Sequence, residues 1–393
     1  MTFPRDPRYL SIMSKTAKPR LPQTRLMVAA SETDANLYWA TKFLAPDPIV
    51  FIEHRKKRYL ILNDLEVDRG RKEAEVDKVL SYSEIEKRIA PKAKRATMSE
   101  VIAHVLRDLG AKEIAVPSNF PLAFALGLKK QRFKTQALPD PFYADRVLKT
   151  KEEKAAIKRS LRFTSEAIQK AYQVLGEAKI KNGYLYWRGA KLTSEILRGV
   201  INVYLMEKNC LGLGTIVAGG EQAVDPHCRG FGPLKAHQTI VMDVFPRSMD
   251  TQYYADMTRT VVKGKASDAV RKQWNTVKEA QEGAIKKIKA GVNGMAIHQW
   301  IHDYFEARGY KTGLVKGRMQ GFFHGTGHGL GLDIHEAPRV SKISEILQAG
   351  TVVTVEPGLY YSGLGGVRIE DVVYVKKGGC EVLSHCPKVL EIS

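Results

Sequence analysis

The chain has 393 residues, which is long enough for two domains with substantial hydrophobic cores. Apolar residues make up 44% of the sequence and charged residues 26%, as in an ordinary soluble globular protein, and no apolar run approaches the roughly 20 residues of a membrane-spanning helix. The formal net charge is +20, but lysine and arginine are dispersed along the whole chain, so we expect neither a nucleic-acid partner nor a membrane partner.

The N-terminus and the cysteines indicate the compartment. Residues 1–24 are rich in proline and basic side chains and lack the apolar core of a signal peptide, so we expect a loose arm, or an arm packed on a partner subunit. The four cysteines, Cys210, Cys228, Cys380 and Cys386, show no metal-type spacing, and their low number suits a reducing cytosol. The sequence therefore predicts a cytoplasmic protein.

Residues 25–145 combine strand and helix patterns and predict a mixed α/β domain. The runs 48–53 and 59–63 are typical of strands, and the short basic segment between them predicts a hairpin turn. A helix is predicted over residues 100–109, with Ser99 as its N-cap. No group of residues in this region suggests catalytic chemistry.

Two prolines near residue 140 mark a domain boundary, and residues 146–393 predict a second, larger domain of the same class. The fold class is therefore α/β, in its α+β form. One long helix is expected after Thr150, an N-cap with Glu153 in capping-box spacing. Further helices are expected over residues 193–208, 270–288 and 294–308, the second of them with Gly291 as its C′ residue.

The segment from His324 to His335 reads His-Gly-Thr-Gly-His-Gly-Leu-Gly-Leu-Asp-Ile-His. Each intervening glycine costs a helix about 1 kcal/mol relative to alanine, so we expect an extended backbone that passes close to other parts of the chain. Side chains alternate in such a segment, which places His324 and His328 on one face. A second pair, His298 and His302, lies on a predicted helix without acidic neighbours, and we do not expect it to bind a metal.

Four acidic residues stand in or beside strand-like, mostly apolar runs: Asp243, Asp256, Glu356 and Glu370. A buried carboxylate is unfavourable unless it is paired, hydrogen-bonded or bound to a metal ion. One such acid usually forms a salt bridge, but four beside a Gly-His motif are hard to satisfy without a cation. The sequence therefore predicts a metal site in which these acids are joined by His328.

The order of these four acids and His328, with the local sequence around each, resembles the pita-bread metallopeptidases, the group of aminopeptidase P, prolidase and methionine aminopeptidase. The resemblance is strong over residues 150–393 and weaker in the N-terminal third. One departure is the spacing of 13 positions from Asp243 to Asp256, two longer than is usual in the family. A longer hairpin loop can absorb it. Asp250, within that loop, lacks the flanking strand pattern of a ligand.

The resemblance implies a pita-bread catalytic domain and a smaller creatinase- or prolidase-like N-terminal domain. It also implies two divalent metal ions. Asp256 and Glu370 would bridge them, Asp243 would bind one ion, and His328 with Glu356 would complete the other. The oxygen-rich ligand set with one imidazole favours Mn, with Co or Zn as alternatives.

Further residues are assigned to substrate and catalysis by the same resemblance. His324 and His335 would contact the substrate and stabilise the tetrahedral intermediate, and His227 would lie at the pocket for the substrate proline. Glu356 would act in catalysis by carrying a proton to the leaving nitrogen. Arg368 alternates onto the same strand face as the last of the acids, and we expect it to orient these acids rather than to bind a substrate carboxylate.

The function that follows is a dinuclear metal-dependent peptidase that cleaves the bond before proline, in the manner of aminopeptidase P. The alternative is an Xaa-Pro dipeptidase (prolidase), which needs a cation for the free carboxylate of proline. The candidates are Arg229 in a glycine-rich loop and Arg368, which we expect Glu356 and Glu370 to occupy. A metal-free creatinase-like hydrolase and a non-catalytic pita-bread binding module are more remote, because all five ligands are present. The oligomeric states usual in this family imply a homodimer or homotetramer.

Overall fold

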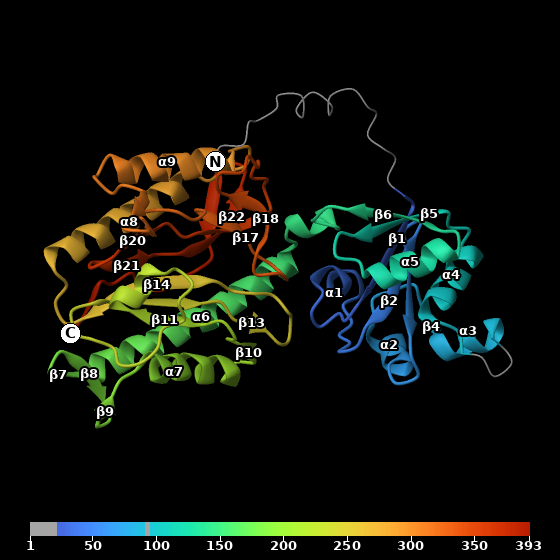
Figure 1. Ribbon diagram of the computed structural model, residues 1–393, viewed down its shortest axis with the longest axis horizontal. Helices are drawn as coiled ribbons and strands as arrows, with labels where there is room; N and C mark the ends of the chain where they lie inside the picture. Colours follow the sequence, from blue (N-terminus) through green and yellow to red (C-terminus); the bar gives the residue numbers. More distant parts are fainter. Residues whose placement is uncertain (1–21, 91–94) are drawn as a thin grey trace. The chain divides into compact units, whose positions relative to one another are not determined.

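The computed structural model describes residues 22–90 and 95–393, and the chain divides into two compact units between Tyr143 and Ala144 (Figure 1). The division lies two residues before the expected start of the second domain. The expected arm lies outside the described residues except for residues 22–24, and Thr24 already begins the first strand. Within the described residues, no helix is long and apolar enough to cross a bilayer.

The first unit is built on one six-stranded mixed sheet with the order β4-β3-β2-β1-β5-β6. Strand residues alternate between its faces: Leu26 packs with helices on one side, and Met27 packs with helices on the other. The strands are β1 (Thr24–Ala29), β2 (Ile49–His54), β3 (Lys57–Leu62), β4 (Lys78–Ser81), β5 (Glu113–Pro117) and β6 (Lys134–Leu138). The helices are α1 (Ala35–Thr41), α2 (Val67–Glu73), α3 (Tyr82–Ile89), α4 (Met98–Asp108) and α5 (Leu122–Lys130).

Two local predictions in this unit meet different outcomes. The basic hairpin is confirmed, but its turn is only Arg55 and Lys56, both with positive φ, which suits the tight turn between two twisted strands. The N-cap of α4 is Thr97 rather than Ser99. Thr97 is the N-cap because it forms a capping box with Glu100, which satisfies two backbone N–H groups at once.

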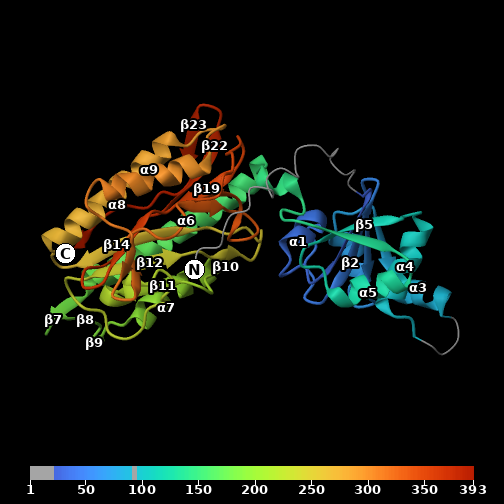
Figure 2. The ribbon, with the colours of Figure 1, turned by 45° about the horizontal axis from the view of Figure 1, so that its top comes forward.

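The second unit places its sheets between two pairs of helices. In Figures 1 and 2, α8 and α9 lie along one side of the strands, and α6 and α7 lie along the other. These helices are α6 (Lys151–Glu177), α7 (Ser194–Glu207), α8 (Asp268–Lys287) and α9 (Gly294–Glu306). The apolar stripe predicted on α8, which runs from Val270 through Trp274 and Val277, is buried against the sheets.

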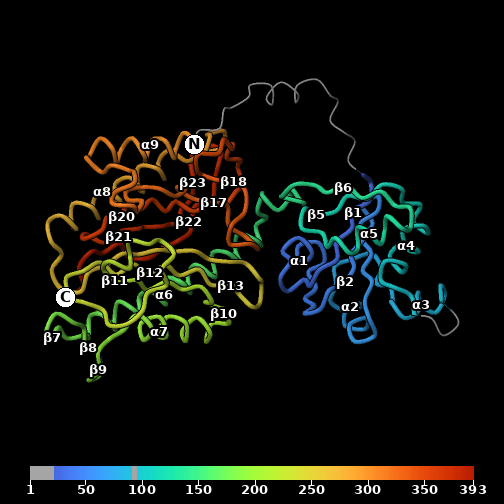
Figure 3. The backbone as a smooth tube through the Cα atoms, in the orientation of Figure 1, coloured from blue at the N-terminus to red at the C-terminus, as the bar shows by residue number. Residues whose placement is uncertain are grey.

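Three groups of strands carry the site residues of this unit. A four-stranded sheet has the order β11 (Ile216–Gly219), β12 (Thr239–Val244), β14 (Met257–Lys263), β24 (Glu391–Ile392). A five-stranded sheet has the order β18 (Glu336–Val340), β17 (Gly327–Gly329), β19 (Val352–Val355), β22 (Asp371–Lys376), β23 (Gly379–Val382). A hairpin joins β20 (Gly358–Tyr361) to β21 (Gly365–Arg368). The backbone trace in Figure 3 shows that β12 and β14 lie beside the later strands β20–β22.

Short elements fill the connections of this unit. They are η2 (Ala144–Val147), β7 (Lys179–Lys181), β8 (Tyr184–Trp187), β9 (Ala190–Lys191), β10 (Cys210–Leu211), η3 (Gly220–Val224), β13 (Arg247–Ser248), β15 (Gly313–Val315) and β16 (Arg318–Gln320). The capping box of Thr150 and Glu153 is confirmed at the start of α6. The prediction that Gly291 is the C′ residue of α8 is wrong, because α8 ends at Lys287 and its C-cap, Ile288, is extended.

Candidate metal centre

The acids predicted upstream come from one β-hairpin. Asp243 lies in β12 opposite Thr258 of β14, and Asp256 immediately precedes β14. The longer spacing between the two acids is absorbed by a loop that contains β13, which pairs with β10. Asp250 lies in this loop on the surface, where it accepts hydrogen bonds from Arg159 and Asn209.

The downstream acids are brought together by strand pairing. Glu356 directly follows β19 and Glu370 directly precedes β22, and these strands are antiparallel with Val355 opposite Asp371. The two carboxylates therefore leave the sheet at the same end. His328 lies in β17, the neighbour of β19 on its other side.

The glycines around His328 are required by close packing. A Cβ atom on Gly327 would lie 2.0 Å from the carbonyl oxygen of Thr354, and one on Gly329 would lie 2.2 Å from that of Ala337. A Cβ atom on Gly331 would lie 2.6 Å from the carboxylate of Glu336. The predicted close approach is therefore confirmed, but the extended backbone is confirmed only over β17, because residues 331–335 form a bend before β18.

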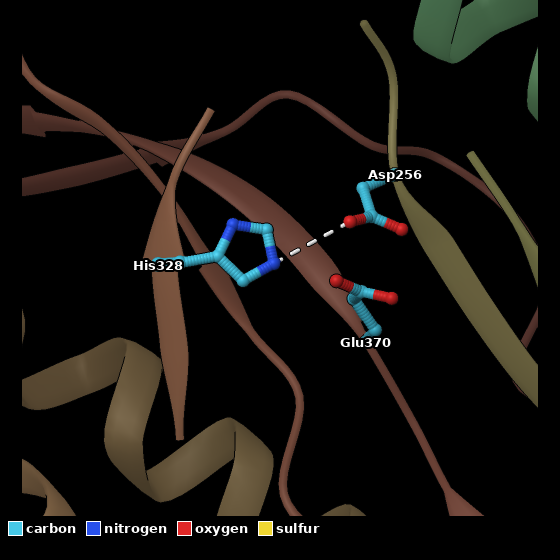
Figure 4. A group of neighbouring side chains, drawn as sticks. All are labelled: Asp256, His328 and Glu370. Carbon is cyan, nitrogen blue, oxygen red and sulfur yellow. Dashed lines mark ion pairs between the residues drawn. The ribbon is translucent and has the colours of Figure 1, made fainter. Parts of the chain in front are cut away.

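Three side chains from three different strands or strand ends converge at the centre of the site (Figure 4). One possible ligand atom from each of Asp256, His328 and Glu370 lies within 4.8 Å of the others. His328 Nε2 is 3.5 Å from Asp256 Oδ2 and 3.4 Å from Glu356 Oε1. Asp243 faces the same cavity. The structure thus brings all five predicted ligands into one place.

The charges of this group are unfavourable without a counter-ion. Burial, together with the charge of Glu370, raises the pKa of Asp256 well above its usual range. Burial also raises the pKa of Glu370, with Glu356 adding to it, and raises the pKa of Glu356 to about 8. Burial lowers the pKa of His328 to about 3 and so keeps its imidazole neutral, as a metal ligand must be.

Unsatisfied oxygen atoms also mark the site as one that fits a cation. Asp243 Oδ1 and Glu370 Oε1 are buried, and neither accepts a hydrogen bond from any of the described residues. Buried acceptors in native proteins nearly always have a partner. Hard oxygen donors with one imidazole fit a divalent cation such as Mn²⁺.

The site opens into a cavity of about 700 Å³. Besides the five predicted ligands, its lining includes every residue that the sequence predicted for substrate or catalysis. The basic residues that surround the ligands are His227, His324, His335, Arg339 and Arg368. Apolar side chains supply much of the remaining wall: Ile216, Phe245, Phe323, Ile334 and Ile343.

Arg368 is buried and tied to one acid. Its Nη2 lies 2.7 Å from Asp243 Oδ2, and its Nη1 donates to the hydroxyl of Tyr360 at 2.9 Å. The expectation that Glu356 and Glu370 occupy this guanidinium is wrong, because β21 and β12 lie close together and place Asp243 at its end. Arg368 thus orients an acid of the cluster.

His324 uses both ring nitrogens on protein partners. Its Nδ1 lies 2.7 Å from the carbonyl oxygen of Gly325 and therefore carries the proton, because a carbonyl can only accept. Burial lowers the pKa of His324 to about 3, so its ring is neutral and its Nε2 accepts the hydroxyl proton of Tyr360 at 2.9 Å. His324 therefore shapes the cavity wall in a fixed tautomer.

Three other residues named by the sequence analysis lie away from the cluster or bind protein partners. Arg229 donates to the carbonyl of Leu213 and is not part of the cavity lining. His298 is buried on α9 with its Nδ1 3.0 Å from the hydroxyl of Thr326, whereas His302 lies beside exposed Asp303. The two helix histidines therefore face different partners.

Two residues of the site were missed by the sequence analysis: Arg339, which lines the cavity, and Tyr360, which is buried and contacts two of the lining residues. Arg339 stands four residues after His335, and the alternation of the strand that contains it was the available signal. Tyr360 had no such signal, because its role depends on the meeting of two distant residues, Arg368 and His324.

Behind the cluster, a buried ion pair supports the strand that begins after Glu370. Arg259 and Asp371 are each only 2% exposed, and Arg259 Nη2 lies 2.8 Å from Asp371 Oδ1. Lys388 Nζ lies 2.7 Å from the other carboxylate oxygen. Arg259 also donates to the backbone carbonyl of Glu370, so it holds the chain at a predicted ligand.

Replacing Asp371 by Asn should destabilise the fold by about 3–5 kcal/mol, because Arg259 would be left as a buried, uncompensated charge. Urea unfolding monitored by circular dichroism measures this loss. The control is Asp303→Asn, whose side chain is 66% exposed and which should change stability by about 0.5 kcal/mol at most. Equal losses in both variants would contradict a structural role for the buried pair.

Comparisons with known proteins agree with this geometry. The family model of metallopeptidase family M24 matches residues 155–377, more than half of the chain. The chain belongs to this family. Membership in a metallopeptidase family implies that the cluster uses a divalent metal.

Individual relatives add detail to the M24 assignment. An alignment with the Xaa-Pro dipeptidase of Pyrococcus furiosus is 30% identical over 250 residues and covers 62% of this chain and 65% of that protein, which is just under two thirds of its length. The structure of an Xaa-Pro dipeptidase from Bacillus anthracis matches 95% of both chains with a TM-score of 0.80 at 23% identity. An X-Pro aminopeptidase from Thermotoga maritima matches 95% of this chain and 98% of its own, with a TM-score of 0.78 at 25% identity. These similarities confirm the pita-bread fold of the M24 chain.

Proposed function

We propose that the protein is a dinuclear metal-dependent peptidase that hydrolyses the bond before proline in short peptides. The observation that carries this proposal is the convergence of four carboxylates and His328 at the floor of a cavity that also contains three further histidines. The relatives and structural neighbours named Xaa-Pro dipeptidase and X-Pro aminopeptidase support proline peptides as the substrate class.

Two ions, with Mn²⁺ preferred, are proposed from the charge of the ligand set. Four carboxylates carry more negative charge than one divalent ion neutralises. Asp256 and Glu370 lie at the centre of the group, and Asp243 and Glu356 line the cavity beside them. In this arrangement Asp256 and Glu370 would be shared by both ions, Asp243 would hold one ion, and His328 with Glu356 would hold the other.

Divalent ions in such a site supply a nucleophilic water at neutral pH and polarise a substrate carbonyl. The chain's own residues then have distinct tasks. Glu356, whose carboxylate lies 3.4 Å from His328 Nε2 in the cavity lining, accepts a proton and returns it to the leaving nitrogen. His335 extends into the cavity and donates to the developing oxyanion. His227 lies in the lining, where we place the pocket for the substrate proline.

Arg339 favours the dipeptidase alternative over aminopeptidase P-like cleavage. Its side chain lines the cavity, and its guanidinium makes no hydrogen bond or ion pair with any of the described residues. A half-buried guanidinium of this kind is suited to bind the free carboxylate of a C-terminal proline. Sequence reasoning considered Arg229 and Arg368 for this role, but Arg368 is paired with Asp243.

Hydrolysis of Ala-Pro, Ala-Pro-Ala and Ala-Ala by the Mn²⁺-loaded protein tests the proposal. We expect cleavage of proline peptides and little cleavage of Ala-Ala, with a kcat/KM for Ala-Pro at least tenfold above that for Ala-Pro-Ala, which is about 1.4 kcal/mol of transition-state binding. A preference of the same size for the tripeptide would support aminopeptidase P-like cleavage instead. Equal cleavage of Ala-Ala would contradict the proposed class.

Replacing Arg339 by Gln should lower kcat/KM for Ala-Pro by roughly 10- to 100-fold, the effect of losing a hydrogen bond to a charged group. The value for Ala-Pro-Ala should change less than threefold, because its carboxylate lies one residue further away. Arg308→Gln, a substitution on the surface of the same unit, is the control. An equal fall in kcat/KM for the two substrates would show that Arg339 does not bind the carboxylate.

Assembly and compartment are further parts of the proposal. We propose a homodimer or homotetramer in the cytoplasm. Helix α7 carries a stripe of exposed apolar side chains, with Ile196, Val203 and Met206 exposed by 38%, 61% and 54%, which supports contact with another subunit. All four cysteines are free thiols, as suits a reducing compartment. Sedimentation velocity should give the mass of two or four chains.

A further inference from the structure

A buried cluster of charges lies beside the cavity and contains no predicted ligand. The side chains of Arg146, Lys149 and Glu336 are 6%, 3% and 7% exposed. Arg146 Nη2 lies 2.5 Å from Glu336 Oε1 and 2.8 Å from Asp333 Oδ2. Lys149 Nζ lies 2.7 Å from Glu336 Oε2. Both oxygens of Glu336 are therefore held by cations that stand nearly 190 residues earlier in the chain.

Glu336 also closes the loop that leads to it. Its Oε1 accepts the backbone N–H of Asp333 at 3.1 Å, and Gly331 packs so closely against the carboxylate that a side chain there would collide. The carbonyl of Gly331 in turn accepts the backbone N–H of Tyr254. The loop from 331 to 336 is thus wrapped around one carboxylate.

His335 is the residue that this loop presents to the cavity. Its ring centroid lies 4.4 Å from that of His328, with the rings nearly perpendicular at 84°. His335 directly precedes Glu336, which is the first residue of β18. The direction of the His335 side chain therefore depends on where Glu336 anchors the start of that strand.

The two cations are themselves held in place. Lys149 donates its backbone N–H to the carbonyl of Gly350, and its Nζ also donates to the carbonyl of Arg146. Lys149 immediately precedes Thr150, the N-cap of α6. Lys149 is therefore attached directly to the capped start of a 27-residue helix.

The energetics favour a role other than stability for this cluster. Burial of three charges carries a large desolvation cost, and apolar residues of similar volume would often stabilise a fold as much or more. Charged groups instead fix a defined geometry, because each hydrogen bond to a carboxylate has a narrow range of distance and direction.

We propose that Glu336, held by Arg146 and Lys149, is a positioning residue that sets the orientation of His335 for catalysis. The inference rests on the proposed function, in which His335 donates to the developing oxyanion. Arg146 and Lys149 act through Glu336, and none of the three contacts the reacting atoms. Their effect is on the rate of the chemical step rather than on the metal content.

The test is Glu336→Gln in the Mn²⁺-loaded protein. The amide keeps the size of the side chain and an acceptor for Asp333, but it removes the charge that holds both cations. We expect kcat for Ala-Pro to fall roughly 10²-fold, the typical effect of a small misplacement of a catalytic group. KM should change less than threefold, and the metal content should be unchanged.

A double-mutant cycle with His335→Ala separates positioning from general damage. If Glu336 acts through His335, Glu336→Gln should cost less than twofold in kcat when His335 is already absent. If the fold-losses of kcat in the two single variants multiply in the double variant, the proposal is wrong. The matched control is Glu381→Gln, which removes an acid paired with Lys154 and Lys376 and lying outside the cavity lining. An equal loss of kcat in this control would also overturn it.

Two further measurements keep the inference testable if the first variant folds poorly or the proposed activity is wrong. Lys149→Met removes only one of the two cations, and we expect a smaller loss of kcat that again disappears in the His335→Ala background. If the wild-type protein cleaves no proline peptide, the proposed function fails. The positioning role is then decided by crystal structures of the wild type and of Glu336→Gln or Lys149→Met. A displaced His335 ring supports it, and an unmoved ring overturns it.

Discussion

Removal of divalent metal with a strong chelator should abolish hydrolysis of Ala-Pro and Ala-Pro-Ala, and addition of Mn²⁺ or Co²⁺ should restore it. The reason is that Asp256, Glu356 and Glu370 are carboxyl groups whose pKa is raised by burial, so their charges need a cation in the cavity. Without it, nothing among the described side chains lining the cavity supplies a nucleophilic water at neutral pH. Assays before chelation, after dialysis and after metal addition measure the effect.

Chelation should also lower the melting temperature. Metal binds the folded chain preferentially, and a ligand present at 100 times its Kd stabilises a protein by about 2.7 kcal/mol. Circular dichroism before and after chelation shows whether the metal-free chain is still folded, which is the control for loss of activity by unfolding. Full activity in a folded, metal-free protein would contradict the dinuclear mechanism and favour the creatinase-like alternative.

Glu370→Gln should lose bound metal together with activity, whereas His335→Ala should keep its metal and lose roughly 10² in rate. Glu370 is 1% exposed, and one of its oxygens has no partner among the described residues, so the neutral amide removes a charge that nothing nearby replaces. His335 lines the cavity but is not one of the five predicted ligands. Elemental analysis and kcat measured on the same preparations distinguish the two outcomes.

The control for the first substitution is Glu381→Gln in β23, the strand that pairs with β22 after Glu370. It makes the same chemical change on a neighbouring strand and should leave metal content and kcat within twofold of wild type. If His335→Ala loses metal while Glu370→Gln retains it, the assignment of ligands and catalytic groups is wrong.

Local patterns allowed much of this molecule to be predicted from its sequence. The capping box at Thr150, the apolar stripe on α8 and the glycines around His328 each depend on neighbours a few residues away, or on the period of one helix or strand. The same holds for the acids, because a carboxylate in an apolar strand is unusual in any fold. Two of the errors, Ser99 and Gly291, are errors in the placement of helix ends.

Only the tertiary structure decided which side chains meet. Arg368 pairs with Asp243 rather than with the acids near it in sequence, and Arg339 lines the cavity. Glu336 is held by cations from the segment just before α6. These contacts depend on the register of paired strands and on how the ends of distant elements are brought together. Periodicity and motif spacing report only on residues close together in the chain. They therefore cannot predict a contact between residues that are more than 100 positions apart.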